Sequence, residues 1–189
     1  MRHVMVDLET TNVKADTAIV AIGAVVFDET EIQEEFYANV NLDSCIDRGM
    51  TISHETLCWW TRQPREAREL AFSFDAEHIM NALSQLSLFV TGNYQYEKED
   101  IVVWGNGAAF DNAVLNLAYS KEGLEVPWDF RNDMCYRTVR KLSGVEKEHE
   151  GVYHYALDDA KAQAFHLMEI NKQCPELNIF NEGMYKYER

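Results

Sequence analysis

The sequence lacks long apolar segments and any recognisable leader. No stretch of about 18 uncharged apolar residues occurs, which is the length that a membrane-spanning helix needs. The first apolar run is interrupted by Asp7 and Glu9, and no small-residue cleavage site of the signal-peptide type follows it. We therefore expect no contact with a membrane and a cytoplasmic location.

Cysteine is scarce, and its spacing does not indicate a metal site. The four cysteines are far apart and form no Cys-x-x-Cys unit, which argues against a zinc ribbon: Cys45, Cys58, Cys135 and Cys174. A disulfide framework is not expected in a reducing compartment. Because free cysteine behaves as a small apolar side chain, we expect four scattered and mostly buried thiols.

Positive charge is also scarce, since 17 lysines and arginines face 32 aspartates and glutamates, for a net charge of −15. Proteins that bind nucleic acid through its backbone are usually basic, and this chain should repel a polyanion at long range. Two interpretations follow. Either the protein does not handle nucleic acid, or it handles only a short stretch and metal ions supply the local positive charge. The motifs described next favour the second interpretation.

The 189 residues, 47% of them apolar, are enough for one domain over residues 1–189 with one hydrophobic core. Apolar patterns predict strands over residues 2–8, 18–27, 31–40, 101–104 and 127–130. They predict helices beginning after Ser53, over 74–89, from near Phe110, from Asp133 to Leu142, and over 155–171. This order predicts an α/β domain with a mixed sheet, in which the fourth strand pairs beside a central first strand.

An Asp-x-Glu pair, Asp7 and Glu9, ends the first predicted strand. Residues at positions i and i+2 of a strand point to the same face, so the two carboxylates should lie side by side. Such a pair is costly unless a cation lies nearby, and Mg²⁺ prefers oxygen ligands of this kind. Taken alone, the pair is more often two solvated acids at the end of a strand.

A second motif, Asn106-x₃-Phe110-Asp111, follows the fourth predicted strand. Its glycines allow a sharp turn off the strand, which brings Asp111 to the start of a helix near the edge of the sheet. A helix-capping aspartate is the common alternative interpretation of Asp111.

The third motif, His154-x₄-Asp159, also contains Asp158 and lies at the entrance of the last predicted helix. A histidine followed by aspartates one turn later can act as a base and as a metal ligand, although acids also favour helix starts for electrostatic reasons alone. Helix geometry leaves both aspartates open. Asp158 faces the histidine if His154 is helical, whereas Asp159 is equally suited if His154 lies in the preceding loop.

The three motifs in this order resemble those of the DEDDh branch of the DnaQ-like 3′-5′ exonucleases, over residues 4–165. The resemblance implies an RNase H-like fold, in which a mixed five-stranded sheet of order 3-2-1-4-5 is flanked by helices. It implies His154 as general base and selects Asp159 over Asp158. It implies two Mg²⁺ or Mn²⁺ ions held by four carboxylates, those of Asp7, Glu9, Asp111 and Asp159. The segment over residues 52–68 is similar to small stand-alone members from phages and bacteria, such as the mycobacterial exoribonucleases and phage exonuclease A.

The expected function is hydrolysis of phosphodiester bonds at the 3′ end of single-stranded DNA or RNA by a two-metal-ion mechanism. Five residues are predicted to touch the substrate, some of them by stacking on a base: Leu8, Thr10, Trp59, Asn106 and Phe110. Packing in the core is the competing role for Trp59, Trp60 and Phe110. The alternative function is a weak or inactive exonuclease-fold module that acts through a protein partner. The resemblance is also compatible with a homodimer.

Overall fold

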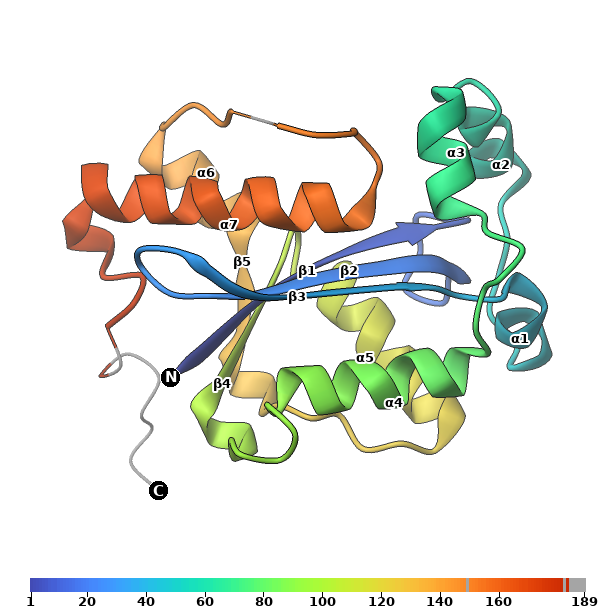
Figure 1. Cartoon of the computed structure of the whole chain (residues 1–189), viewed down its shortest axis with the longest axis horizontal. Coiled ribbons are helices and arrows are strands. Elements are labelled where there is room, and N and C mark those ends of the chain that lie inside the picture. The colour runs from blue at the N-terminus through green and yellow to red at the C-terminus, as the bar shows by residue number, and fades with distance from the viewer. Residues whose placement is uncertain (149, 182, 184–189) are drawn as a thin grey trace.

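A central five-stranded mixed sheet organises the chain, and the computed structural model describes residues 1–148, 150–181 and 183. The sheet order is β3-β2-β1-β4-β5, so the predicted order 3-2-1-4-5 is confirmed (Figure 1). The central strand β1 pairs antiparallel with β2 and parallel with β4. The strands are β1 (Arg2–Thr10), β2 (Ile19–Phe27), β3 (Ile32–Asn39), β4 (Ile101–Gly105) and β5 (Asp133–Cys135).

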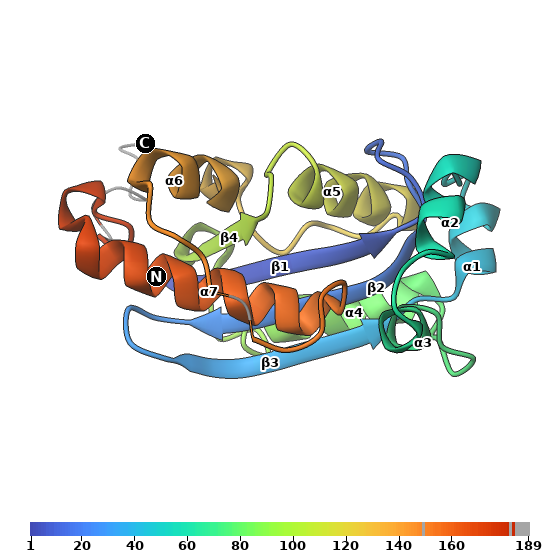
Figure 2. The same cartoon turned by 90° about the horizontal axis from the view of Figure 1, so that it is seen from above.

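Helices cover both faces of the sheet. The long helix α7 crosses one face with α6 beside it, while α4 and α5 cover the other, and α1 to α3 gather at the end of the sheet where β1 stops (Figures 1 and 2). The helices are α1 (Leu42–Asp47), α2 (His54–Trp60), α3 (Arg65–Ala71), α4 (Ile79–Val90), α5 (Asp111–Glu122), α6 (Tyr136–Ser143) and α7 (Ala156–Gln173). Short 3₁₀ turns occupy Lys98–Asp100, Phe130–Asn132 and Pro175–Leu177.

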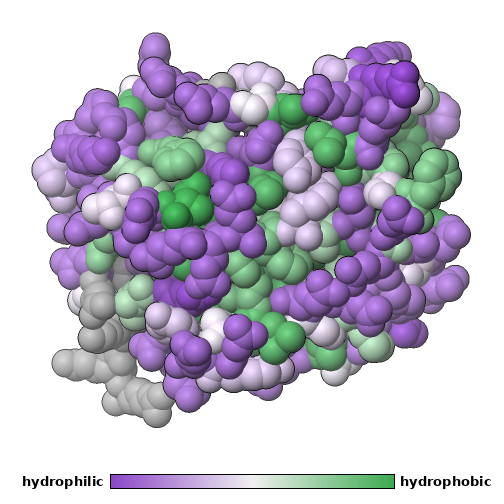
Figure 3. All heavy atoms as spheres, in the orientation of Figure 1, coloured by the Kyte–Doolittle hydropathy of each residue, from purple (hydrophilic) through white to green (hydrophobic). Residues whose placement is uncertain are grey.

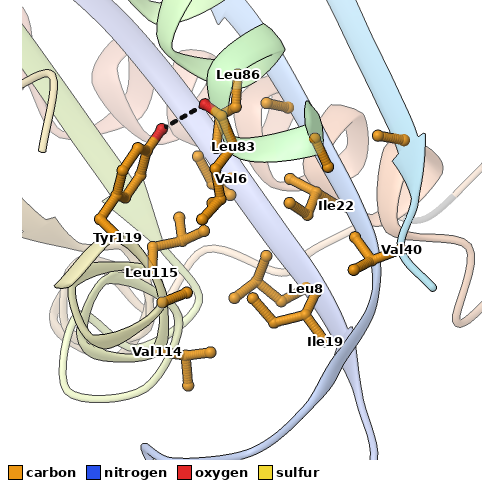
Figure 4. Packing of buried hydrophobic residues seen from close by; sticks show 14 of the residues in the cluster. Val6, Leu8, Ile19, Ile22, Val40, Leu83, Leu86, Val114, Leu115 and Tyr119 are labelled. Atoms are coloured by element: carbon orange, nitrogen blue, oxygen red, sulfur yellow. Dashed lines mark hydrogen bonds between the residues drawn. The ribbon is translucent and has the colours of Figure 1, made fainter. Parts of the chain in front are cut away.

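Side chains of β1 alternate between two hydrophobic cores. Val4, Val6 and Leu8 share one face, as predicted, and pack against α4 and α5 (Figure 4). Met5 points to the opposite face, which α7 covers. Burial of each such side chain contributes roughly 1.5–3 kcal/mol, which fixes the register of the strand. The same alternation places the next two odd-numbered positions of β1 on the α7 face.

The surface is mainly polar. Hydrophilic residues occupy most of the face shown in Figure 3, and apolar residues appear between them. Among the helices of the described residues, none is long and apolar enough to cross a membrane.

The strand predicted over residues 127–130 is wrong, because β5 begins only at Asp133. Pro127 has no backbone N–H for a ladder. Trp128 is buried, and its Nε1 donates to Asp133 Oδ1 at 2.8 Å. Asp133 consequently starts a strand and does not cap a helix, and α6 begins later, at Tyr136.

Three other local predictions also need correction. The helix predicted over 74–89 starts at Ile79, where the His78 side chain accepts a hydrogen bond from the Met80 amide at 3.1 Å. The two short helices α1 and α3 were not predicted. Of the four cysteines, only Cys45 is buried, and the other three are partly exposed. The helix capped by Ser53 is confirmed as α2, with the Ser53 side chain accepting from the Thr56 amide.

Gly23 allows α7 to lie directly on the sheet. A Cβ at this position would fall within 2.3 Å of three backbone atoms of Ala156 and Leu157, the first residues of α7. Gly23 also pairs with Asp7 in the register of β1 and β2. The missing side chain therefore brings the beginning of α7 against the carboxyl end of the central strand.

We expect Gly23→Ala to lower the free energy of unfolding by about 3 kcal/mol or more, since overpacking against backbone cannot be relieved by a side-chain rotation. Gly123→Ala is the matched control. Gly123 has a φ of 67°, but a Cβ there would meet nothing within 4 Å, so only a left-handed backbone cost of about 1–2 kcal/mol applies. Urea denaturation measures both. Equal losses in the two variants would contradict the packing role of Gly23.

Candidate active site at the end of the central strand

Asp7 and Glu9 lie on the α7 face of β1, near the carboxyl end of the strand. Both are buried, with 9% and 6% of their surface exposed. The parallel neighbour β4 ends beside them, because Val6 pairs with Gly105. A Cβ at Gly105 would lie 2.9 Å from the Asp111 Cβ, so the glycine permits the tight entry into α5. Asp111 is the first residue of that helix and is itself buried.

The start of α7 brings the third motif to the same place. His154 lies in the preceding loop with a φ of 65°, and its backbone N–H donates to Asp159 Oδ2 at 2.9 Å. The neighbouring Asp158 instead accepts a hydrogen bond from the Val152 amide at 2.9 Å. The two aspartates therefore diverge, with Asp158 bound to the loop and Asp159 beside His154.

A pocket of about 240 Å³ contains all five residues of the three motifs. One donor atom each of Glu9, His154 and Asp159 lies within 4.8 Å of the other two. The structure thus brings together groups that are separated by most of the sequence. The lining residues are Asp7, Leu8, Glu9, Asn106, Phe110, Asp111, Arg137, His154 and Asp159.

Three carboxyl groups of the pocket, those of Asp7, Glu9 and Asp111, resist ionisation. Burial raises the pKa of Asp7 well above its usual value, and the charges of Asp111, Glu9 and Asp159 raise it further. Burial, followed by the charges of Asp159 and Asp111, raises the pKa of Glu9 to about 8. Burial also raises the pKa of Asp111 to about 7. The cluster therefore repels its own negative charge, and a bound cation would relieve that repulsion.

Gln163 is a site residue that the motifs did not reveal. Its Nε2 donates to Asp7 Oδ1 at 2.7 Å, and the contact is buried. Gln163 lies one helical turn after Asp159, so the i, i+4 spacing on α7 is the sequence signal that would have identified it. The hydrogen bond fixes the Asp7 carboxylate and lowers its pKa against the stronger effect of burial.

Two cationic side chains near the pocket were also missed. Arg137 of α6 lines it, and its guanidinium opposes the rise in the pKa of Asp111. Lys147 lies in the loop between α6 and α7. Burial lowers the pKa of Lys147, against the opposing charges of Asp159 and Asp7. No motif points to either residue, because their places depend on how β5 and the loop fold back over the site.

Some of the residues predicted to touch substrate line the pocket, and others do not. Leu8, Asn106 and Phe110 line the pocket. Thr10 is not among the lining residues, and its hydroxyl donates to the Asn12 carbonyl at 2.9 Å. Its contact with substrate stays a prediction.

The two adjacent tryptophans of α2 have different environments. Trp60 is 3% exposed, and its Nε1 donates to the Thr10 carbonyl at 2.9 Å, so this ring packs in the core. Trp59 is 39% exposed and meets the His154 ring edge to face, with 4.8 Å between the ring centroids. Trp59 is therefore positioned next to the histidine at the site.

Comparison with known proteins identifies a family over most of the chain. Residues 2–171 match the model of the 3′-5′ exoribonuclease Rv2179c-like domain. No curated protein matches the chain.

Solved structures of exonucleases share the fold at low sequence identity. E. coli Exonuclease I in complex with a dA16 oligonucleotide is 15% identical over 93% of this chain, with a TM-score of 0.62. The nuclease domain of 3′hExo, a DEDDh family member bound to rAMP, is 14% identical over 92%, with a TM-score of 0.61. Exonuclease X in complex with 5′ overhanging duplex DNA is 19% identical over 92%, with a TM-score of 0.50. The chain spans 42% of the Exonuclease I chain, and 92% and 93% of the other two.

These likenesses confirm the predicted RNase H-like fold of the DEDDh exonucleases. The family model covers far more than half of the chain, so it also confirms the predicted enzyme class, a 3′-5′ exonuclease. This chain belongs to the family of 3′-5′ exoribonuclease Rv2179c-like domains.

Proposed function

We propose that this protein hydrolyses the phosphodiester bond at the 3′ end of a single-stranded nucleic acid, using two Mg²⁺ or Mn²⁺ ions. The observation that carries the proposal is the meeting of four carboxylates in one pocket, those of Asp7, Glu9, Asp111 and Asp159. The family description favours RNA as the substrate. Water attacks the phosphorus, the bond to the 3′ oxygen of the upstream nucleotide breaks, and a nucleoside 5′-monophosphate leaves.

The donor set fits divalent metal ions. The DEDDh neighbours imply a dependence on divalent metal. Carboxylate oxygens are the ligands that Mg²⁺ and Mn²⁺ prefer, and the raised pKa values of Asp7, Glu9 and Asp111 mark a concentration of negative charge that cations would offset. When bound, the ions supply neutralisation of the scissile phosphate, acidification of water and stabilisation of the departing 3′ oxygen.

His154 is proposed to accept the proton of the attacking water. Imidazole is suited to this role because it changes protonation state near neutral pH. A left-handed conformation costs a residue other than glycine roughly 1–3 kcal/mol, and such strain is often retained at functional sites. The hydrogen bond from its amide to Asp159 and the ring contact with Trp59 hold His154 in place.

We propose that the 3′ end of a nucleic-acid strand occupies the pocket. Leu8 and Phe110 provide apolar surface for the terminal nucleotide, and Asn106 provides polar groups. Trp59 is exposed enough to stack on a base, which is worth about 1–3 kcal/mol. The net charge of −15 disfavours a long polyanion, so attraction is expected only where local cations lie. The related structures named above hold a DNA oligonucleotide, rAMP or duplex DNA with an overhang, which agrees with recognition of strand ends.

Digestion of a labelled strand tests the proposed function. We expect the protein with Mn²⁺ to shorten a 5′-labelled single-stranded RNA from its 3′ end and to release nucleoside monophosphates. Asp7→Asn should abolish cleavage because it removes one charge from the cluster. Matched DNA and duplex substrates define the preference. Absence of product with wild-type protein under both metals would instead support the alternative, a binding module that acts through a protein partner.

We expect His154→Ala to lower kcat by roughly 10²–10⁴-fold while the fold is retained, which is the usual contribution of a general base. Alanine is less favoured than histidine at a φ of 65°, and the variant loses the ring contact with Trp59, so we expect a loss of stability of about 1–2 kcal/mol that leaves the fold intact. His54→Ala is the control, since His54 is an exposed histidine of α2 outside the pocket. Steady-state kinetics and a melting curve measure both effects, and full turnover in His154→Ala would remove the imidazole from the mechanism.

Because the pKa of Glu9 is raised, we expect Glu9→Gln to increase the free energy of unfolding by an amount that depends on pH. A folded-state pKa of about 8, against an ordinary 4.5, means that the metal-free protein loses stability as the pH rises through that range. Glu9→Gln removes the loss, so its advantage over wild type should grow between pH 5 and pH 9 to about 2–4 kcal/mol. Mn²⁺ should stabilise wild type more than the variant.

Urea denaturation at several pH values without metal measures this difference. Glu29→Gln, which changes an exposed glutamate in the turn after β2, is the control and should show no such trend. A constant difference between Glu9→Gln and wild type across this pH range would contradict the self-repelling cluster.

A further inference from the structure

Arg137 is the second residue of α6, and among the described residues that line the pocket it is the one lysine or arginine. Its side chain is exposed, and Asp111 lies close enough to feel its charge. The remaining charged lining groups are carboxylates, apart from His154. The Arg137 guanidinium thus places positive charge at an acidic pocket of a chain whose net charge is −15.

The guanidinium lies over Gly107, in the motif that precedes Asp111. A Cβ added at Gly107 would lie 3.4 Å from Cζ, 3.4 Å from Nη2 and 3.6 Å from Nη1 of Arg137. The nearly equal distances mean that the flat face of the guanidinium is turned toward Gly107. Its N–H groups then point sideways, within the plane of the group, and remain available to a ligand.

No carboxylate of the described part of the chain forms an ion pair with Arg137. Within residues 1–148, 150–181 and 183, Arg137 forms no ion pair within 4 Å and donates no hydrogen bond. A forked cation with free donors beside a pocket is suited to bind an oxyanion with two oxygens in one plane.

We propose that Arg137 binds a phosphate of the substrate strand and positions it in the pocket, an inference that rests on the proposed function. Divalent ions bound by the carboxylates would repel the guanidinium, whereas the negative phosphate would attract it. The residue therefore supplies the short-range attraction that an acidic chain lacks. It is a positioning and binding residue.

Binding to a short RNA tests this assignment apart from catalysis. A 5′-labelled single-stranded hexanucleotide is titrated with protein carrying His154→Ala, at fixed Mn²⁺ and several KCl concentrations, and fluorescence anisotropy gives Kd. Adding Arg137→Ala should raise Kd about 10–100-fold, as expected for the loss of charge-assisted hydrogen bonds. The slope of log K against log[KCl] should become shallower by about 0.7, the value for one contact with a single-strand phosphate.

Two further variants make the result specific. Arg137→Lys keeps the charge but loses the fork, so it should keep the salt slope with an intermediate Kd. Arg140→Ala, an exposed arginine of the same helix outside the pocket, should change neither quantity. An unchanged salt slope in Arg137→Ala would overturn the proposal, and so would a loss explained by a higher Mn²⁺ requirement, which would show that Arg137 acts through Asp111.

The same variants separate this inference from the proposed function. If wild type cleaves RNA and Arg137→Ala keeps the KM and salt slope of wild type, the role of Arg137 is wrong and the exonuclease stands. If wild type never cleaves but the salt slope of binding falls in Arg137→Ala, the phosphate contact stands and the exonuclease is wrong.

Discussion

Mutual repulsion among buried carboxylates is the constraint around which the structure is organised. Asp7, Glu9 and Asp111 are all nearly inaccessible to water, and each has a pKa raised by burial. Folding must offset that cost elsewhere, since a buried charge without a partner is strongly unfavourable. The two cores on either side of β1 supply the stabilisation, and they hold the strand so that its last acidic residues cannot turn away.

The carboxylates meet in one pocket because glycines let two helices pack closely against the sheet. Gly23 allows the start of α7 to reach the sheet, and Gly105 allows Asp111, the first residue of α5, to pack against the end of β4. Gln163 then fixes Asp7 from one turn farther along α7. Arg137 lines the pocket and Lys147 lies near it, so a chain of net charge −15 does place positive charge at the site. Under the proposed function, these cations would attract a nucleic-acid end at short range.

The resemblance of the three motifs to the DEDDh exonucleases predicted the sheet order, and local signals predicted the strands and helix starts that carry the acidic motifs. Alternation in β1 placed Asp7 and Glu9 on one face, and the motif around Asp111 followed a short apolar strand. Asp158 and Asp159 could not be separated by helix geometry alone. The choice depends on the left-handed backbone of His154. Histidine is enriched in that conformation, but it adopts it too rarely for the sequence alone to indicate it. Arg137 and β5 escaped prediction for a related reason. The short strand Asp133–Cys135 is defined by its pairing with β4 and by the buried Trp128, not by its own three residues.

The proposed function requires that the carboxylates of Asp7, Glu9, Asp111 and Asp159 together hold two divalent ions next to His154. Titration with Mn²⁺ in the presence of a nucleoside 5′-monophosphate, followed by the electron paramagnetic resonance of free Mn²⁺, counts the ions directly. The account predicts two Mn²⁺ bound per chain, and a loss of binding in Asp7→Asn. Binding of no Mn²⁺, or binding that Asp7→Asn leaves unchanged, would contradict it.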